Sequence, residues 1–161
     1  SGRKITYFDP EINESYVPHV VETSIGLDRM FLAVLSHSFR EEELENGESR
    51  VILKIPAVLA PLKAAILPLT KKDGLPEKAR AIMKMLQVDF NCQYEAKDSI
   101  GKRYRRQDAI GTPLCITVDH QTLEDNTVTL RDRDTMKQER ISVDKLHSII
   151  SDKVNIAKYL A

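Results

Sequence analysis

The stretch AAILPLTKKDGLPEKARAIMKMLQVDFNCQY (residues 64–94) carries the pattern that decides the fold. Its apolar run at 64–69 predicts a buried strand, and the segment 88–94 predicts another. Between them lies a stripe with helical spacing and an early Pro76, which predicts a helix. The stripe consists of Leu75, Ala79, Ile82, Met83 and Leu86. A strand, a helix and a strand in this order are typical of a sheet with parallel strands.

The same alternation continues towards the C-terminus. The predicted elements are a short basic helix (98–111), strands at 114–118 and 126–133 joined by a polar loop, an edge strand (138–143) and a closing helix (142–154) capped by Ser142. We therefore predict an α/β fold with a mixed sheet of about five strands, flanked by helices.

Towards the N-terminus, the acidic segment at 40–49 predicts a linker, because it contains Gly47 and has little to bury. Before it, residues 16–24 predict a strand whose start is irregular at Pro18, followed by a turn at Gly26 and a helix with an apolar face. A strand, a turn and a helix are too small to own a core. The predicted division is therefore residues 1–49 and 50–161.

Composition limits the class of protein. At 161 residues, 42% hydrophobic and 30% charged, the chain can bury a core and is not a disordered composition. No apolar run approaches the roughly 20 residues of a membrane span, and the first residues lack the apolar region of a signal peptide. Cys92 and Cys115 indicate reduced core thiols of a cytoplasmic protein. Net charge is −5 in residues 1–50 and +5 in the remainder, so the second region tolerates a polyanionic partner, although a solvated mixed surface gives the same distribution.

Glu22, Ser24 and Arg29 form the first candidate site. Arg29 falls in the first turn of a predicted helix, where a cation is unfavourable by a few tenths of a kcal/mol. One interpretation is a surface ion pair between Arg29 and Glu22. The other is a site that grips a small zwitterion through the carboxylate and a phosphate through the guanidinium.

The segment VVETSIGLDR (20–29) resembles motif 3 of class II aminoacyl-tRNA synthetases, and together with YFDPE (7–11) it is similar to the dimeric glycyl-tRNA synthetase family. Three downstream segments resemble that family's anticodon-binding domain, so the resemblance covers residues 5–153. They are LAPLKAAILPL (59–69), DSIGKRYRRQDAIGTPLCITVD (98–119) and NTVTLRDRDTMKQERI (126–141).

The resemblance implies that residues 1–49 are the C-terminal end of a catalytic domain plus an acidic linker, and that residues 50–161 are an anticodon-binding domain. It implies that Arg29 contacts ATP and that Glu22 and Ser24 line the glycine pocket. The family joins glycine to tRNA-Gly through glycyl-adenylate with ATP and Mg²⁺, as a cytoplasmic homodimer. Motifs 1 and 2 are not in this sequence, so we expect the C-terminal portion of an enzyme, inactive alone, with no bound cofactor, no DNA partner and no membrane partner.

The second candidate site is the basic segment around Tyr104, which shares a predicted buried helix face with Ile100. Four cations and one aromatic residue suit phosphate contacts and base stacking, although a solvated helix face has the same pattern. The candidate tRNA contacts are Lys102, Arg103, Arg105 and Arg106, with Asp98, Asp108, Arg131 and Arg133 for base edges.

Two other functions fit parts of the sequence. The first alternative is a non-catalytic RNA-binding or regulatory module with the same fold, although such a module does not need ETSIGLDR (22–29). The second is a small doubly wound protein that binds a nucleotide at its strand ends, but no Gly-rich phosphate loop supports it. The four histidines are scattered without ligand spacing, so no metal site is predicted.

Overall fold

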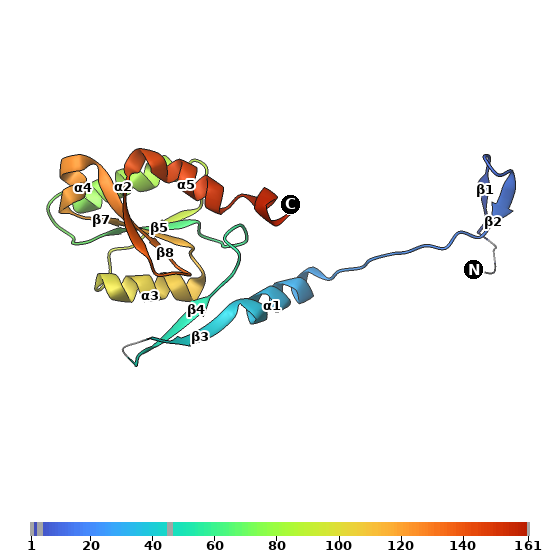
Figure 1. The fold of residues 1–161 in the computed structure, drawn as a ribbon, viewed down its shortest axis with the longest axis horizontal. Helices are drawn as coiled ribbons and strands as arrows, with labels where there is room; N and C mark the ends of the chain where they lie inside the picture. Colours follow the sequence, from blue (N-terminus) through green and yellow to red (C-terminus); the bar gives the residue numbers. More distant parts are fainter. Residues whose placement is uncertain (1, 3–4, 45–46, 161) are drawn as a thin grey trace. The chain divides into compact units, whose positions relative to one another are not determined.

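The computed structural model describes residues 2, 5–44 and 47–160. The chain divides into two compact units between Leu32 and Ala33. The second unit holds a five-stranded sheet with helices on both faces, as Figure 1 shows. This architecture confirms the predicted α/β fold with a mixed sheet.

The sheet has the strand order β6-β5-β7-β8-β9. Its strands are β5 (Ala64–Pro68), β6 (Cys92–Tyr94), β7 (Leu114–Val118), β8 (Thr127–Asp132) and β9 (Gln138–Ser142). β5 lies parallel to β6 and to β7, whereas β8 and β9 extend the sheet in antiparallel pairs. The second strand is shorter than predicted, since residues 88 and 89 form a turn and residues 90 and 91 belong to no strand.

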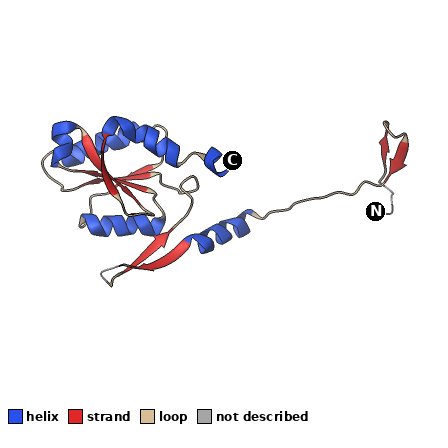
Figure 2. Ribbon diagram, viewed as in Figure 1, coloured by secondary structure: helices blue, strands red, loops and turns tan. Residues whose placement is uncertain are grey.

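Two layers of helices cover the sheet (Figure 2). α2 (Leu75–Leu86), α4 (His120–Asp125) and α5 (Leu146–Lys153) lie on one face, and α3 (Ile100–Ile110) lies on the other (Figure 1). The short 3₁₀ segments η1 (Val143–Lys145) and η2 (Ile156–Tyr159) flank α5.

The buried side chains of β5 separate by period 2 into two apolar clusters. Ala64 and Ile66 pack with the apolar stripe of α2 and with α5 in the larger cluster. Ala65 and Leu67 pack with Cys115 against α3, where Ile100 and Tyr104 lie together as predicted. Because β5 is buried on both faces, its sequence is a continuous apolar run without alternation.

The predicted linker at 40–49 is wrong. β3 (Phe39–Glu43) follows directly after α1 (Leu27–Ser38) and pairs in antiparallel register with β4 (Ser49–Leu53). β4 alternates exposed and buried side chains, with Arg50 and Ile52 facing inward. A hairpin therefore forms in spite of the acidic charge, because its second strand packs against α3.

The end of α3 lies very close to the chain beyond β4. Gly111 ends the helix with φ +84°, and a Cβ at this position would lie 2.8 Å from Ile55 Cγ2. Only glycine combines this backbone conformation with this separation.

The first unit contains a small hairpin and an extended segment. β1 (Tyr7–Asp9) pairs with β2 (Glu14–Tyr16), and the rings of Tyr7 and Tyr16 meet edge to face at 5.9 Å. Residues 17–26 have no regular structure, so the predicted strand at 16–24 is wrong. A strand needs hydrogen-bonded neighbours, and no described strand pairs with this segment.

Two predictions near the C-terminal strands also fail locally. The polar loop between β7 and β8 contains α4, which begins with a capping box formed by Asp119 and Thr122. Ser142 does not cap α5, because η1 precedes that helix and Ser142 makes no capping hydrogen bond.

Both cysteines are free thiols, as predicted. Burial raises the pKa of Cys92 to about 11 and that of Cys115 to about 12. At neutral pH both side chains are therefore protonated and behave as small apolar groups.

Candidate nucleic-acid interface

The carboxyl ends of β5 and β6 form a topological switch point. After β5 the chain passes to α2 on one face of the sheet, and after β6 it passes to α3 on the other. The two connections thus leave neighbouring parallel strands in opposite directions. Ligands of open α/β sheets bind at such a crevice.

Arg103 lies at the carboxyl ends of β5 and β6 and is 2% exposed. Its Nη1 donates to the carbonyl oxygens of Pro68 at 2.7 Å and Glu95 at 3.3 Å, and its Nη2 donates to that of Leu69 at 3.3 Å. Burial lowers the pKa of Arg103. The guanidinium thus satisfies carbonyls that the strands leave unpaired, and it places a positive charge under the ends of β5 and β6.

Exposed lysines lie in the segments that border this end of the sheet. Lys71 and Lys72 follow β5, Lys97 follows β6, and Lys102 lies in the first turn of α3. None of these four lysines forms an ion pair with any residue that the structure describes. They provide free positive charge of the kind that a phosphate backbone attracts.

Arg106 links the start of α3 to the residues after β6. Its Nε donates to Glu95 Oε1 at 2.7 Å and its Nη1 to Asp98 Oδ2 at 2.9 Å, while Nη2 donates to the Lys97 carbonyl. The hydrogen bond from Arg106 lowers the pKa of Asp98, and the one to Glu95 raises the pKa of Arg106. Asp98 and Arg106 are therefore accessible but already paired.

Four of the predicted tRNA contacts are interior residues, and we correct their assignment. Arg103, Asp108, Arg131 and Arg133 are all buried. Asp108 accepts a bidentate pair from Arg131 at 2.8 and 2.9 Å and a third hydrogen bond from Arg50 at 3.1 Å. A buried carboxylate needs such partners, and these residues have no surface left for RNA.

Arg133 is committed to the backbone and to Asp134. Its Nη1 donates to the carbonyl oxygens of Leu53 at 3.0 Å and Gly111 at 2.8 Å, and it also makes a bidentate pair with Asp134. Arg133 thereby joins the end of β4 to the end of α3.

Tyr104 is not available for base stacking, contrary to the sequence-based expectation. Its hydroxyl lies 2.6 Å from Thr117 Oγ1, and the guanidinium of Arg131 stands over its ring at 4.8 Å. Burial raises the pKa of Tyr104. Arg105, by contrast, is half exposed and pairs with Glu48 in the hairpin turn.

Glu22, Ser24 and Arg29 are exposed and are not brought together by a sheet. Glu22 and Ser24 lie in the irregular segment before α1, and Arg29 lies in its first turn. Among the described residues, none of these three side chains makes a hydrogen bond or ion pair. The predicted ion pair between Glu22 and Arg29 does not form.

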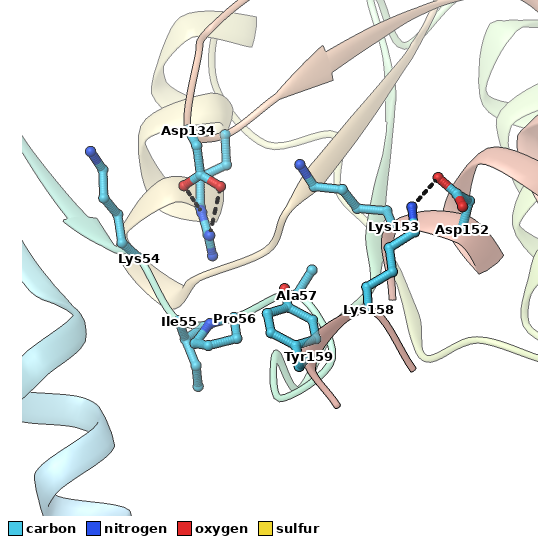
Figure 3. A pocket seen from close by; sticks show the side chains of 10 residues that line it. Lys54, Ile55, Pro56, Ala57, Asp134, Asp152, Lys153, Lys158 and Tyr159 are labelled. Atoms are coloured by element: carbon cyan, nitrogen blue, oxygen red, sulfur yellow. Dashed lines mark hydrogen bonds and ion pairs between the residues drawn. The ribbon is translucent and has the colours of Figure 1, made fainter. Parts of the chain in front are cut away.

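A cavity of about 460 Å³ lies at the opposite end of the sheet, near the start of β7 (Figure 3). Lys54, Arg133, Lys153 and Lys158 contribute to its lining. Each of these cations is paired with a carboxylate, such as Lys158 with Asp152. The cations that line the cavity therefore belong to a surface ion network, and they offer little free positive charge to an anion.

Sequence reasoning missed three residues that shape the interface. Arg50 directly follows the predicted linker and was not identified, although the β-branched residues Val51 and Ile52 beside it favour a strand. Glu95 directly follows an apolar strand, where ligand-binding side chains gather, and Gln107 lies one helical turn after Arg103. No local pattern distinguishes a buried glutamine from an exposed one.

The fold defines a class of protein, the small α/β domains with an open mixed sheet that helices cover on both faces. Residues 63–153 match the family model described as anticodon binding domain, and the chain belongs to that family. A solved structure with the same fold is the RNA binding domain of threonyl-tRNA synthetase from Cryptosporidium parvum Iowa II. It matches with a TM-score of 0.57 and 25% identity, covering 62% of this chain and 25% of that one.

Two curated relatives identify the particular branch that the chain resembles. It is 55% identical to glycine–tRNA ligase of Clostridium tetani and 51% identical to glycine–tRNA ligase of Chlorobaculum tepidum, each over 154 residues. Each alignment covers 96% of this chain and 33% of the relative. The chain thus spans about a third of the length of the curated relatives that it matches.

The described residues contain no group of three side chains that could hold a metal ion, and none of their helices has the length and apolar character to cross a membrane.

Proposed function

We propose that this chain is the anticodon-binding part of a glycine–tRNA ligase and that it binds the anticodon arm of tRNA-Gly. The observation that carries the proposal is the match of residues 63–153 to anticodon binding domains, combined with the free lysines at the strand ends. The relatives that are named glycine–tRNA ligases support the choice of tRNA.

In the proposed complex, phosphates of the anticodon loop meet Lys71, Lys72, Lys97 and Lys102. These contacts supply affinity without sequence discrimination. Arg103 contributes indirectly, since it holds together the ends of β5 and β6 that carry three of these lysines.

The complete enzyme would join glycine to the tRNA through glycyl-adenylate, with ATP and Mg²⁺, and would act as a homodimer. In it, Arg29 would contact ATP and Glu22 and Ser24 would line the glycine pocket. We propose that the chain alone does not activate glycine, because these three side chains are exposed and nothing in the described structure orients them.

The test is a titration of the chain with a tRNA-Gly anticodon stem-loop and with the same RNA after replacement of its anticodon cytosines. We expect replacement to weaken binding by at least about 10-fold, since reading of base edges is worth that much per base. Lys102→Ala should weaken both RNAs and reduce the slope of log affinity against log salt by about 0.7–0.9.

Lys84→Ala is the matched control, because Lys84 is an exposed lysine on α2, on the opposite face of the sheet from α3. It should leave affinity and slope unchanged. Equal binding to both RNAs would favour the alternative of a non-specific RNA-binding module and would contradict anticodon reading.

A further inference from the structure

A second cavity lies beside the free edge of β6, and we name it the β6 edge pocket. It has a volume of about 330 Å³ and is lined by Gln93, Glu95, Arg106, Gln107, Ala109 and Ile110. β6 is the outermost strand of the sheet, so the pocket is open to a ligand from the side. Three of its polar residues come from positions that no sequence pattern singled out.

A buried amide fixes the polar wall of this pocket. Gln107 is 1% exposed, and its Oε1 accepts a hydrogen bond from Thr112 Oγ1 at 2.7 Å. This bond orients the amide so that Nε2 donates to Gln93 Oε1 at 3.2 Å and to Glu95 Oε2 at 3.1 Å. The Gln93 and Glu95 side chains are therefore held in position before any ligand arrives.

After these hydrogen bonds form, Gln93, Glu95 and Arg106 still have hydrogen-bonding groups free for a ligand. Glu95 Oε2 accepts one hydrogen bond from Gln107 and has capacity for another, and the side chain is 17% exposed. Gln93 Nε2 donates to no described residue. Arg106 Nη1 uses one of its two N–H groups on Asp98, which leaves the other free. The pocket thus offers one charged acceptor and two donors.

Two of the residues that line the pocket are aliphatic. Ala109 and Ile110 are both exposed on the last turn of α3, and Ile110 is 46% exposed. These side chains give an apolar contact for the face of a planar ring. The polar wall and the apolar surface together match the edge and the face of an unstacked base.

Cytosine is the base whose edge complements this set. It presents an amino donor and two acceptors, N3 and O2, which correspond to Glu95, Gln93 and Arg106. Uracil and guanine would place a carbonyl oxygen where cytosine places its amino group, against the Glu95 carboxylate. Adenine keeps the amino group but lacks the second acceptor. The pocket therefore favours cytosine and opposes uracil.

We propose that the β6 edge pocket binds one cytosine of the anticodon and discriminates it from uracil through Glu95. This proposal rests on the proposed function and names the residues that would make it specific. Gln107 is a positioning residue in this arrangement, because it acts on the base only through Gln93 and Glu95.

The test uses the whole chain and anticodon stem-loops in which each cytosine is singly replaced by uracil. We expect one of the replacements to weaken binding by wild-type protein about 10- to 100-fold. In Glu95→Gln the amide can donate to the uracil carbonyl, so the ratio of the two affinities should fall below about 3. Gln93→Ala should weaken cytosine binding about 3- to 10-fold. Fluorescence anisotropy at one fixed salt concentration measures all of these affinities.

Glu139→Gln is the matched control, since Glu139 is an exposed glutamate on β9, at the other edge of the sheet. It should retain the full discrimination. A Glu95→Gln variant that keeps the wild-type ratio overturns the pocket assignment and leaves the proposed function intact. If Glu95→Gln does not fold, unchanged cytosine affinity in Gln93→Ala overturns it equally. If wild-type protein does not distinguish the RNAs at all, the proposed function itself fails.

Discussion

The two faces of α3 carry similar charged residues in opposite surroundings. On the inner face, Arg103 and Asp108 are almost completely buried and make hydrogen bonds only within the protein. On the outer face, Lys102 and Arg105 are exposed, and Lys102 has no described ion-pair partner. One short basic segment thus supplies both the internal framework and the charged surface.

This difference shows how a run of charges should be interpreted. Positions 103, 104, 107 and 108 lie on one side of a helix with 3.6 residues per turn, so half of the segment faces the sheet. Buried charges on that side are tolerated because backbone carbonyls accept hydrogen bonds from Arg103, and the guanidinium groups of Arg131 and Arg50 donate to Asp108. The comparison predicts large stability effects on the inner face and small ones on the outer face.

The largest effect is expected from Asp108→Asn. The change leaves Arg50 and Arg131 buried without their shared carboxylate, so the free energy of unfolding should fall by about 3–5 kcal/mol. Urea denaturation measures this loss. Asp98→Asn is the control, because Asp98 is an exposed carboxylate that also pairs with an arginine. Its loss of stability should be far smaller than that of Asp108→Asn, because an exposed ion pair contributes little. Equal losses of unfolding free energy in the two variants would contradict the difference between the inner and outer faces of α3.

The second largest loss of stability is expected from Arg103→Met. This change removes three hydrogen bonds to backbone carbonyl oxygens at the ends of β5 and β6. The free energy of unfolding should fall by about 2–3 kcal/mol, since hydrogen bonds from a charged donor are lost and carbonyls stay buried. Arg105→Met on the outer face should change it by no more than about 0.5 kcal/mol. Thermal unfolding of both variants compares them directly, and a stable Arg103→Met protein would contradict the structural role of Arg103.

The smallest effect concerns a pair of intermediate burial, Asp119 with Arg140. The hydrogen bond from Arg140 lowers the pKa of Asp119. The pair therefore stabilises the fold above the ordinary Asp pKa of about 3.9, and this contribution is lost as pH falls through the lowered value. At pH 6 the free energy of unfolding of the wild type should exceed that of Asp119→Asn by about 1 kcal/mol, and this difference should narrow as the pH falls below about 4.

Asparagine keeps the helix-capping role of Asp119, so the comparison isolates the charge. Arg140→Met removes the same pair from the other side and should show the same narrowing with acid. A gap that stays constant from pH 6 to pH 3 would assign the effect to packing.

The sequence predicts the framework of the second unit well, because its elements are periodic and strongly apolar. The stripe of α2 and the continuous run of β5 have one stable arrangement, a helix packed on a buried strand. The hairpin of β3 and β4 was missed because its acidic residues look like a solvated linker. A hydrogen bond from Arg50 in β4 to Asp108 in α3 holds the hairpin in place, and these residues lie 58 positions apart in sequence.

The site was harder to predict than the fold. Lys102 and Arg105 were expected on the surface and lie there, whereas Arg131 and Arg133 were expected at the RNA and are interior. Burial of an arginine depends on which carbonyls and carboxylates the tertiary fold brings near, and a linear sequence does not show this. The predicted roles of Glu22, Ser24 and Arg29 stay predictions.

The two protected thiols have a practical consequence for labelling. With pKa values of about 11 and about 12, Cys92 and Cys115 are thiolates at most on the order of one molecule in a thousand at pH 8. A maleimide dye would therefore react far faster with a cysteine introduced at an exposed position. Lys102→Cys would place such a dye on the outer face of α3, where its fluorescence could report contact with RNA against a low background.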